Sequence, residues 1–189
     1  IVAAVLVLVY MLPIYIMLIR SFKTLQDFAH NLAFPEVWYF GNYQNVFAAG
    51  DIWIGFKNSL ILCVETVVLE IIVAAMAAYG VARSSGAVNN AIRKINMLVM
   101  MIPGIALLVG TYSLMVKMGL SNTLTGLALL SAAGGIPATM FMYVNFIISI
   151  PVALDEAAAI DGAGVIRTFL TIIMPQLKAV TVTRIIMAA

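Results

Sequence analysis

The sequence has little charge, one cysteine and one histidine, and each scarcity excludes a class of protein. Charged residues make up 10% of the 189 positions, against about 25% in soluble domains. The ten Lys and Arg and the eight Asp and Glu are dispersed and leave a net charge of +2, which argues against a nucleic-acid surface. Cys63 has no second cysteine with which to form a disulfide. His30 has no second ligand pattern beside it, so we expect no metal site.

What the sequence has instead is hydrophobic length. Hydrophobic residues make up 64% of the chain and the mean hydropathy is +1.11, values typical of membrane proteins. A membrane-spanning helix needs about 20 predominantly apolar residues. Stretches of this kind predict four spans and the start of a fifth, over residues 1–19, 58–82, 95–116, 124–148 and 179–189. We therefore expect an all-α polytopic transmembrane helical bundle in a single domain.

The loops between these spans indicate which way the chain crosses the membrane. Residues 83–94 carry three basic and no acidic side chains, which favours the cytoplasmic side. Alternation then places residues 20–57 and 117–123 outside, and residues 149–178 inside. We expect Pro13 to kink the first span.

Two further features concern the later spans. The pair Pro103-Gly104 is expected to break the third span. In the fourth span, Ala128 and Ala132 lie four residues apart, a spacing that favours close helix packing.

The second inside loop carries the sequence DEAAAIDGAGVIRTFLTIIMP, which is too polar to span a membrane. Asp155 and Glu156 fall in the first turns of a short helix, where acidic side chains interact favourably with the helix dipole. Gly162 can end or bend that helix. A second helix over residues 165–174 is expected to stop at Pro175. By periodicity alone, an amphipathic interfacial helix with solvated charges explains the loop equally well.

The spacing of this loop resembles the EAA loop of the membrane permeases of bacterial ATP-binding-cassette (ABC) importers. The matching pattern is Glu-Ala-Ala, three residues, Gly162, nine residues and then Ile-Ile-Met-Pro. The segments NSLILCVETVVLEIIVAAMAAYGVAR and GLSNTLTGLALL resemble carbohydrate-type permeases, of the kind found as the second maltose permease subunit. Two residues depart from the family pattern, Met174 in place of Leu and Asn145 where Arg is common.

The resemblance implies an ABC importer permease fold, of which this chain would supply about four and a half of six spans. It implies a permease subunit of an ATP-driven bacterial sugar importer in the cell (inner) membrane, and not an enzyme. The implied partners are a second permease subunit, two cytoplasmic ATP-binding subunits and an extracytoplasmic sugar-binding protein. The chain has no phosphate-loop lysine motif, so we expect no cofactor in it and ATP bound by the partner ATPase. It opens on Ile1 and closes within an apolar run, which we interpret as a fragment.

The resemblance also implies a set of residues that couple the loop to the ATPase: Glu156, Ala157, Ala158, Asp161, Gly162 and Pro175. In this reading Glu156 supplies a charged contact, and the two alanines let the helix sit close to its partner. Asp161 caps or pairs near the bend at Gly162. Pro175 sets where the next membrane helix begins.

Two carboxyl groups inside the second span are candidates for a different role. Carboxyl groups within the membrane are rare and usually face a cavity or a partner. Glu65 and Glu70 lie about 140° apart around a helix, so both cannot face one narrow pathway. We take Glu70 as the better candidate to line a substrate pathway, with packing against the partner permease as the alternative. Asn145 and Tyr112 are weaker pathway candidates.

The same two carboxyl groups support a rival function from another class. An ion-coupled secondary transporter would use Glu65 and Glu70 as proton sites. A membrane scaffold without transport is a third reading.

Overall fold

The structure, a computed structural model, describes residues 2–29 and 32–188. His30, and the ends of the first and fifth predicted spans at Ile1 and Ala189, lie outside the described residues. Every regular element in the described part of the chain is helical, which confirms the all-α prediction. The chain divides into two compact units, Ile1–Lys57 and Asn58–Ala189, and each is described by itself. The single domain expected from the sequence stays a prediction.

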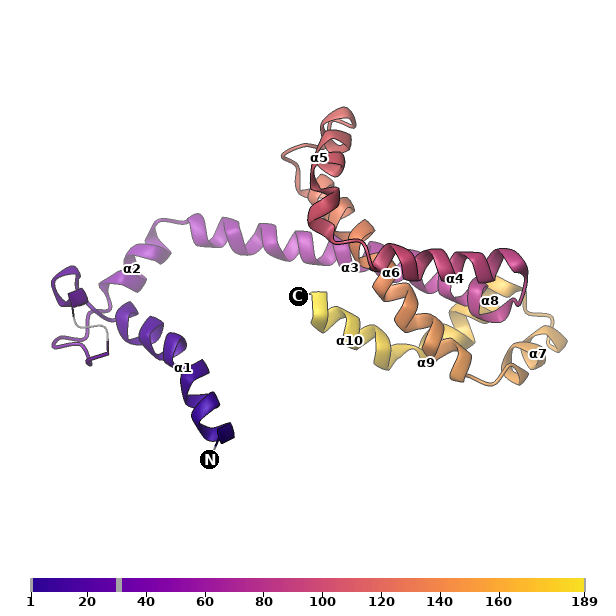
Figure 1. Ribbon diagram of the computed structural model, residues 1–189, viewed down its shortest axis with the longest axis horizontal. Helices are drawn as coiled ribbons and strands as arrows, with labels where there is room; N and C mark the ends of the chain where they lie inside the picture. Colours follow the sequence, from indigo (N-terminus) through magenta and orange to yellow (C-terminus); the bar gives the residue numbers. More distant parts are fainter. Residues whose placement is uncertain (1, 30–31, 189) are drawn as a thin grey trace. The chain divides into compact units, whose positions relative to one another are not determined.

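The first unit contains α1 (Val2–Ser21), the 3-10 helix η1 (Leu25–Ala29) and α2 (Gly41–Ala48) (Figure 1). Pro13 lies inside α1. The first basic residue of α1 is Arg20, in its last turn. The predicted outside loop over residues 20–57 is therefore partly helical.

An aromatic cluster organises the chain after α1. The ring of Phe22 lies 5.2 Å from Trp38, 5.4 Å from Phe40 and 5.3 Å from Tyr43, measured between centroids. The side-chain amide of Asn42 donates to the carbonyl oxygens of Ser21 and Lys23 at 3.0 and 2.9 Å. These contacts hold the start of α2 beside the end of α1.

Helix α3 (Asp51–Arg83) has 33 residues and extends beyond the predicted span of 58–82 at both ends. Asp51 lies in its first turn and Arg83 in its last, and both charges complement the helix dipole. At 1.5 Å per residue the helix is about 50 Å long, longer than the roughly 30 Å of bilayer hydrocarbon. Its ends therefore reach beyond the apolar layer.

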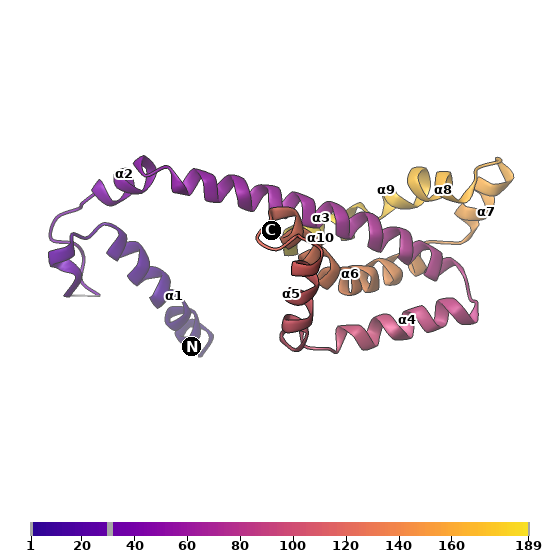
Figure 2. The same cartoon turned by 90° about the horizontal axis from the view of Figure 1, so that it is seen from above.

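The third predicted span is not one straight helix. Residues 95–116 fall on α4 (Ala87–Met100), on the short 3-10 helix η2 (Gly104–Leu107) and on α5 (Leu108–Lys117), and the two halves meet at 94°. Figure 2 shows this corner between α4 and α5. Pro103 lies at the break in an extended conformation. Because proline has no backbone N–H, the helix cannot continue through it with its usual hydrogen bonds.

The predicted inside loop of 83–94 is also shorter than expected. Helix α4 begins at Ala87, after Gly86 in an extended conformation, and Arg93 and Lys94 lie on the helix. The polar residues that indicated a loop form the more hydrophilic part of an amphipathic helix.

Helix α6 (Leu124–Ser149) agrees closely with the predicted span of 124–148. The Thr123 hydroxyl accepts a hydrogen bond from the backbone N–H of Gly126 at 3.0 Å and caps its start. Ala128 and Ala132 are buried, as their small-residue spacing predicted. The side chain of Asn96 donates to the carbonyl of Pro137 at 2.9 Å, which connects α4 to α6.

The second inside loop is mostly helical. After α6 come α7 (Ala153–Ile160), α8 (Val165–Thr168), the π-helical turn η3 (Phe169–Ile173), α9 (Met174–Gln176) and α10 (Lys178–Ala188). We call residues 153–176, from α7 to α9, the elbow segment.

The second loop helix ends at Gln176, one residue beyond the stop predicted at Pro175. The helical backbone runs from Val165 to Gln176 and then bends by 72° into α10. Within it the N–H of Met174 donates to the carbonyl of Phe169, one residue further back than in an α-helix. A wider π turn is one way for a helix to pass a proline that lacks an N–H.

By length and composition, two helices, α3 and α6, can cross a membrane. The number rises to as many as four if each of two bent helix pairs, Ala87–Met100 with Gly104–Lys117 and Val165–Gln176 with Lys178–Ala188, counts as one span. The stretch Val5–Ser21 is a shorter apolar helix. The core of the second unit contains small residues of α3 and larger residues of α6, of the elbow segment and of the bend that follows it: Ala74, Ala75, Ala78, Tyr143, Ile147, Ile173 and Leu177.

Candidate functional site

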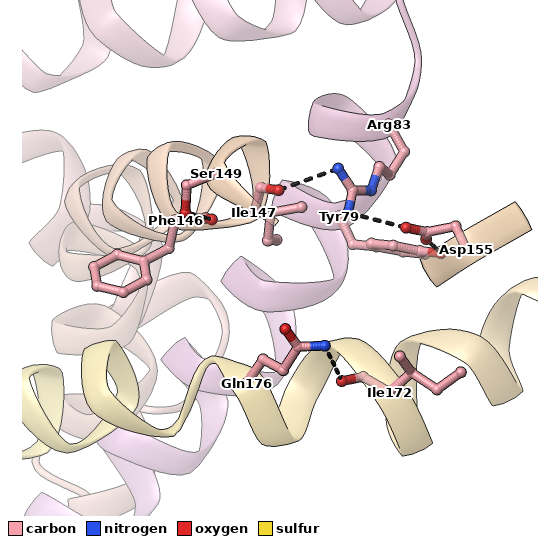
Figure 3. Close-up of polar contacts among 8 residues, drawn as sticks. All are labelled: Tyr79, Arg83, Phe146, Ile147, Ser149, Asp155, Ile172 and Gln176. Carbon is pink, nitrogen blue, oxygen red and sulfur yellow. Dashed lines mark hydrogen bonds and ion pairs between the residues drawn. The ribbon is translucent and has the colours of Figure 1, made fainter. Parts of the chain in front are cut away.

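The first turn of α7 is fixed to the end of α3 by Asp155. The Tyr79 hydroxyl donates to Oδ1 of Asp155 at 2.6 Å, and Nη2 of Arg83 lies 2.9 Å from Oδ2. Nη1 of Arg83 also donates to the carbonyl of Ile147 at 3.1 Å (Figure 3). The side chains of Arg83 and Asp155 are only 13% and 17% exposed, so the ion pair is largely shielded from water. These contacts join α3, α6 and α7 at one point.

The positions of these residues on their helices explain the arrangement. Asp155 lies in the first turn of α7, where a carboxylate is favourable. Arg83 lies in the last turn of α3, where a cation is favourable. Ile147 lies in the last turn of α6, where its carbonyl accepts from the backbone N–H of Ile150 at 3.1 Å and also from Arg83.

Aromatic and apolar packing attaches the rest of the elbow segment to α3. The rings of Tyr79 and Phe169 lie 5.2 Å apart between centroids and are tilted by 35°. Ile173 is fully buried, as is Leu177, at the bend between α9 and α10. The elbow segment therefore contacts α3 at Asp155 and at Phe169.

The structure places five of the six predicted coupling residues on the exposed side of the elbow segment. Glu156, Ala157, Asp161, Gly162 and Pro175 are exposed, whereas Ala158 is buried. Asp161 caps α7 through its backbone, whose N–H donates to the carbonyl of Ala157 at 3.0 Å.

Gly162 has the conformation that a glycine bend requires. Its φ is +79°, a left-handed value that costs residues with a Cβ free energy. Gly164, two residues on, is extended with φ −72°. The bend between α7 and α8 thus depends on one glycine and not on the other.

A second polar cluster lies inside the helix bundle, around Glu70. Nε and Nη2 of Arg184 both lie 2.6 Å from Oε2 of Glu70. The Thr139 hydroxyl donates to the same oxygen at 3.2 Å. Glu70 is 1% exposed, so its carboxylate is closed off from solvent by α6 and α10.

The four pathway candidates are not brought together. Glu70 is paired with Arg184, and Asn145 is exposed. Glu65 has a buried Oε2 with no hydrogen-bond partner in the described part of the chain. Tyr112 is 64% exposed.

Tyr112 borders a pocket of about 460 Å³ between α5, α6 and the start of α3. Within residues 2–29 and 32–188, no three His, Cys, Asp or Glu side chains are grouped so that they could hold a metal ion.

Comparison with known proteins decides the family. Residues 70–189 match the family described as "Binding-protein-dependent transport system inner membrane component". The chain belongs to this family. Members of the family are transport components and not enzymes, and they lie in the inner membrane, as the sequence predicted.

Several relatives of this transport component are sugar-transport permeases by name. It is 34% identical over 182 residues to the "Melibiose/raffinose/stachyose import permease protein MelC" of Bacillus subtilis, covering 96% of this chain and 66% of MelC. It is 34% identical over 185 residues to the "Multiple sugar-binding transport system permease protein MsmG" of Streptococcus mutans, covering 95% of this chain and 65% of MsmG. The chain therefore spans slightly less than two thirds of the length of these relatives.

A solved structure shares the fold. This transport component superposes with a TM-score of 0.88 on a chain from a crystal structure of "a bacterial ABC transporter involved in the import of the acidic polysaccharide alginate". The match covers 100% of this component and 66% of that chain, at 19% sequence identity. The likeness confirms the predicted ABC permease fold.

Sequence analysis of this transport component missed the residues that anchor the elbow segment. Arg83 was noted only as a positive charge near the membrane, and Asp155 only as a helix-dipole charge. A basic residue ending one span and an acidic residue opening the loop helix were the available signal. Tyr79 gave no signal, because tyrosine is common near the ends of membrane helices.

Proposed function

We propose that the chain is a permease subunit of an ATP-driven bacterial sugar importer, that it forms half of the translocation pathway, and that its elbow segment couples to a cytoplasmic ATPase. One observation carries the coupling role. Asp155 is bound to Tyr79 and Arg83 of α3, whereas the next residue, Glu156, is exposed. A coupling element needs both properties, because it must be attached firmly to membrane helices and also offer charge to a partner.

Exposed apolar side chains beside Glu156 also support a partner on this face. Ile160 is 87% exposed, Val165 72% and Ile166 70%, and these residues flank the bend at Gly162. Clustered apolar side chains next to a charge are typical of protein–protein interfaces. Ala157 has no long side chain and allows a partner backbone to approach closely.

The proposed substrate class is sugar, on the strength of the relatives' names. MelC is named for melibiose, raffinose and stachyose, MsmG for multiple sugars, and MdxG of Bacillus subtilis for maltodextrin. MdxG is 26% identical over 171 residues, covering 90% of this chain and 62% of MdxG.

The proposed assembly contains a second permease subunit, two cytoplasmic ATP-binding subunits and an extracytoplasmic sugar-binding protein. ATP is bound by the ATPase subunits, because this chain contains no phosphate-loop motif. Many large apolar side chains of α3 and α6 are exposed, which suits contact with lipid or with the second permease.

The ion-coupled alternative is less favoured. It would use Glu65 and Glu70 as proton sites, but Arg184 and Thr139 already occupy Oε2 of Glu70 and the Glu70 side chain is buried.

Uptake of radiolabelled melibiose, raffinose and maltodextrin into vesicles containing the full-length transporter tests the proposed function. We expect uptake of at least one sugar to require ATP hydrolysis and to continue when ionophores remove the ion gradients. Uptake that follows the ion gradient without ATP would establish the ion-coupled transporter instead. An absence of all uptake would favour the scaffold.

A further inference from the structure

The carboxylate of Glu70 is closed off from solvent, which a residue lining a substrate pathway would not need to be. Three polar hydrogens converge on the single oxygen Oε2, from Nε and Nη2 of Arg184 and from Thr139. The other oxygen, Oε1, lies so close to Gly135 that a Cβ at position 135 would collide with it. A sugar hydroxyl therefore has no path to either oxygen of Glu70.

The position of the cluster along the chain gives it a mechanical meaning. Asp155, at the start of the elbow segment, is bound by Arg83 of α3. Arg184, beyond the end of the elbow segment on α10, is bound by Glu70 of the same helix. Glu70 and Arg83 lie about 20 Å apart along α3 at 1.5 Å per residue. One continuous helix is thus ion-paired to the start of the elbow segment and to the helix that follows it.

We propose that Glu70 and Arg184 are positioning residues that make α10 follow α3 when the elbow segment moves, and that Glu70 does not contact substrate. The inference rests on the proposed coupling function of the elbow segment. In this arrangement α3 moves with both the elbow segment and the helix that follows it. ATP-driven displacement of the elbow segment then reaches the membrane interior through α3 and α10 together.

The physical chemistry of a buried ion pair makes this role testable by paired substitutions. Removal of one partner leaves an uncompensated charge in an apolar environment, which is more damaging than removal of both. Glu70→Gln strands the guanidinium of Arg184, and Arg184→Gln strands the carboxylate of Glu70. The double variant contains two neutral amides and strands neither charge.

The first test measures transport per ATP hydrolysed, and the apparent KM for sugar, in the assembled full-length transporter. We expect both single variants to lose transport per ATP, and the double variant to regain a substantial part of it. The KM for sugar should stay unchanged in all three. The inference is overturned if Glu70→Gln raises the KM for sugar while Arg184→Gln leaves it unchanged. It is also overturned if the loss of transport per ATP in the double variant equals the sum of the losses in the two single variants.

The second test measures the distance between spin labels at Ile72→Cys on α3 and Ile186→Cys on α10, both exposed positions, with Cys63→Ala as background. We expect the same narrow distance distribution with and without ATP, and a broadened one when Glu70→Gln is added. In the protein with Glu70 and Arg184 both intact, a change of this distance on addition of ATP would overturn the inference. Failure of the proposed function looks different, because the parent transporter would then show no ATP-dependent sugar uptake.

Discussion

The guanidinium of Arg83 lies 2.9 Å from the carboxylate of Asp155, which brings the last turn of α3 against the first turn of α7 across 71 intervening residues of sequence. Tyr79, one helical turn before Arg83, binds the other oxygen of the same carboxylate. The elbow segment is therefore attached to a membrane helix through charge and hydrogen bonding together. This attachment allows a force applied to exposed residues such as Glu156 to reach α3.

Asp155→Asn should weaken this attachment by about 1.5–3 kcal/mol, the usual range for hydrogen bonds to charged groups. Tyr79→Phe keeps the ring contact with Phe169 and removes one donor to the same carboxylate, so its cost should fall in the same range. Thermal unfolding of the purified full-length transporter measures both effects. Asp161→Asn is the matched control, because Asp161 is exposed and caps α7 through its backbone. Equal stability of the Asp155 variant and the control would refute the anchoring role.

Gly162→Ala should destabilise the bend between α7 and α8 by about 1–2 kcal/mol, because φ +79° is unfavourable for a residue with a Cβ. Gly164→Ala makes the same chemical change at φ −72° with no close neighbour, and should change stability by less than about 0.5 kcal/mol. Substrate-stimulated ATP hydrolysis should fall in the first variant and stay normal in the second. Similar behaviour of the two variants would show that the bend does not depend on the glycine conformation.

Gly135→Ala should displace the carboxylate of Glu70, because the new Cβ collides with Oε1, and should cost about 1–3 kcal/mol as other overpacked sites do. Gly134→Ala is the adjacent control, since a Cβ there meets no atom within 4 Å. The readout is the yield of assembled transporter together with its unfolding temperature. If both alanines are tolerated equally, then the space around Glu70 is not as tight as the structure indicates.

The sequence predicted well those features that depend on neighbouring residues. The membrane-spanning pattern of α6, the break at Pro103 and the bend at Gly162 each follow from local hydrophobicity or from the backbone limits of one residue. The elbow segment was located from its polar composition between apolar spans and from a spacing that resembles the EAA loop.

Features that depend on distant residues could not be predicted in the same way. Glu70 and Arg184 are separated by 114 positions, and nothing in either neighbourhood indicates the other. Glu70 was consequently interpreted as a pathway residue, although its surroundings in the structure are closed. The π turn over Phe169–Ile173 was not predicted, because hydrophobic periodicity does not distinguish such a turn from an α-helix.

We propose that Glu156 docks the elbow segment on a cytoplasmic ATPase. The most direct test compares the Glu156→Lys variant with the parent protein in two measurements: pull-down of the ATPase subunit, and substrate-stimulated ATP hydrolysis. Reversing this exposed charge places like charges together, which costs several kcal/mol at an interface. Glu36→Lys, the same substitution at an exposed site in the predicted outside loop, is the control, and membrane abundance is measured for both. We predict loss of pull-down and of stimulated hydrolysis in Glu156→Lys alone, at normal abundance. Normal pull-down and normal stimulation in Glu156→Lys would contradict the claim and leave the elbow segment as a solvated interfacial helix.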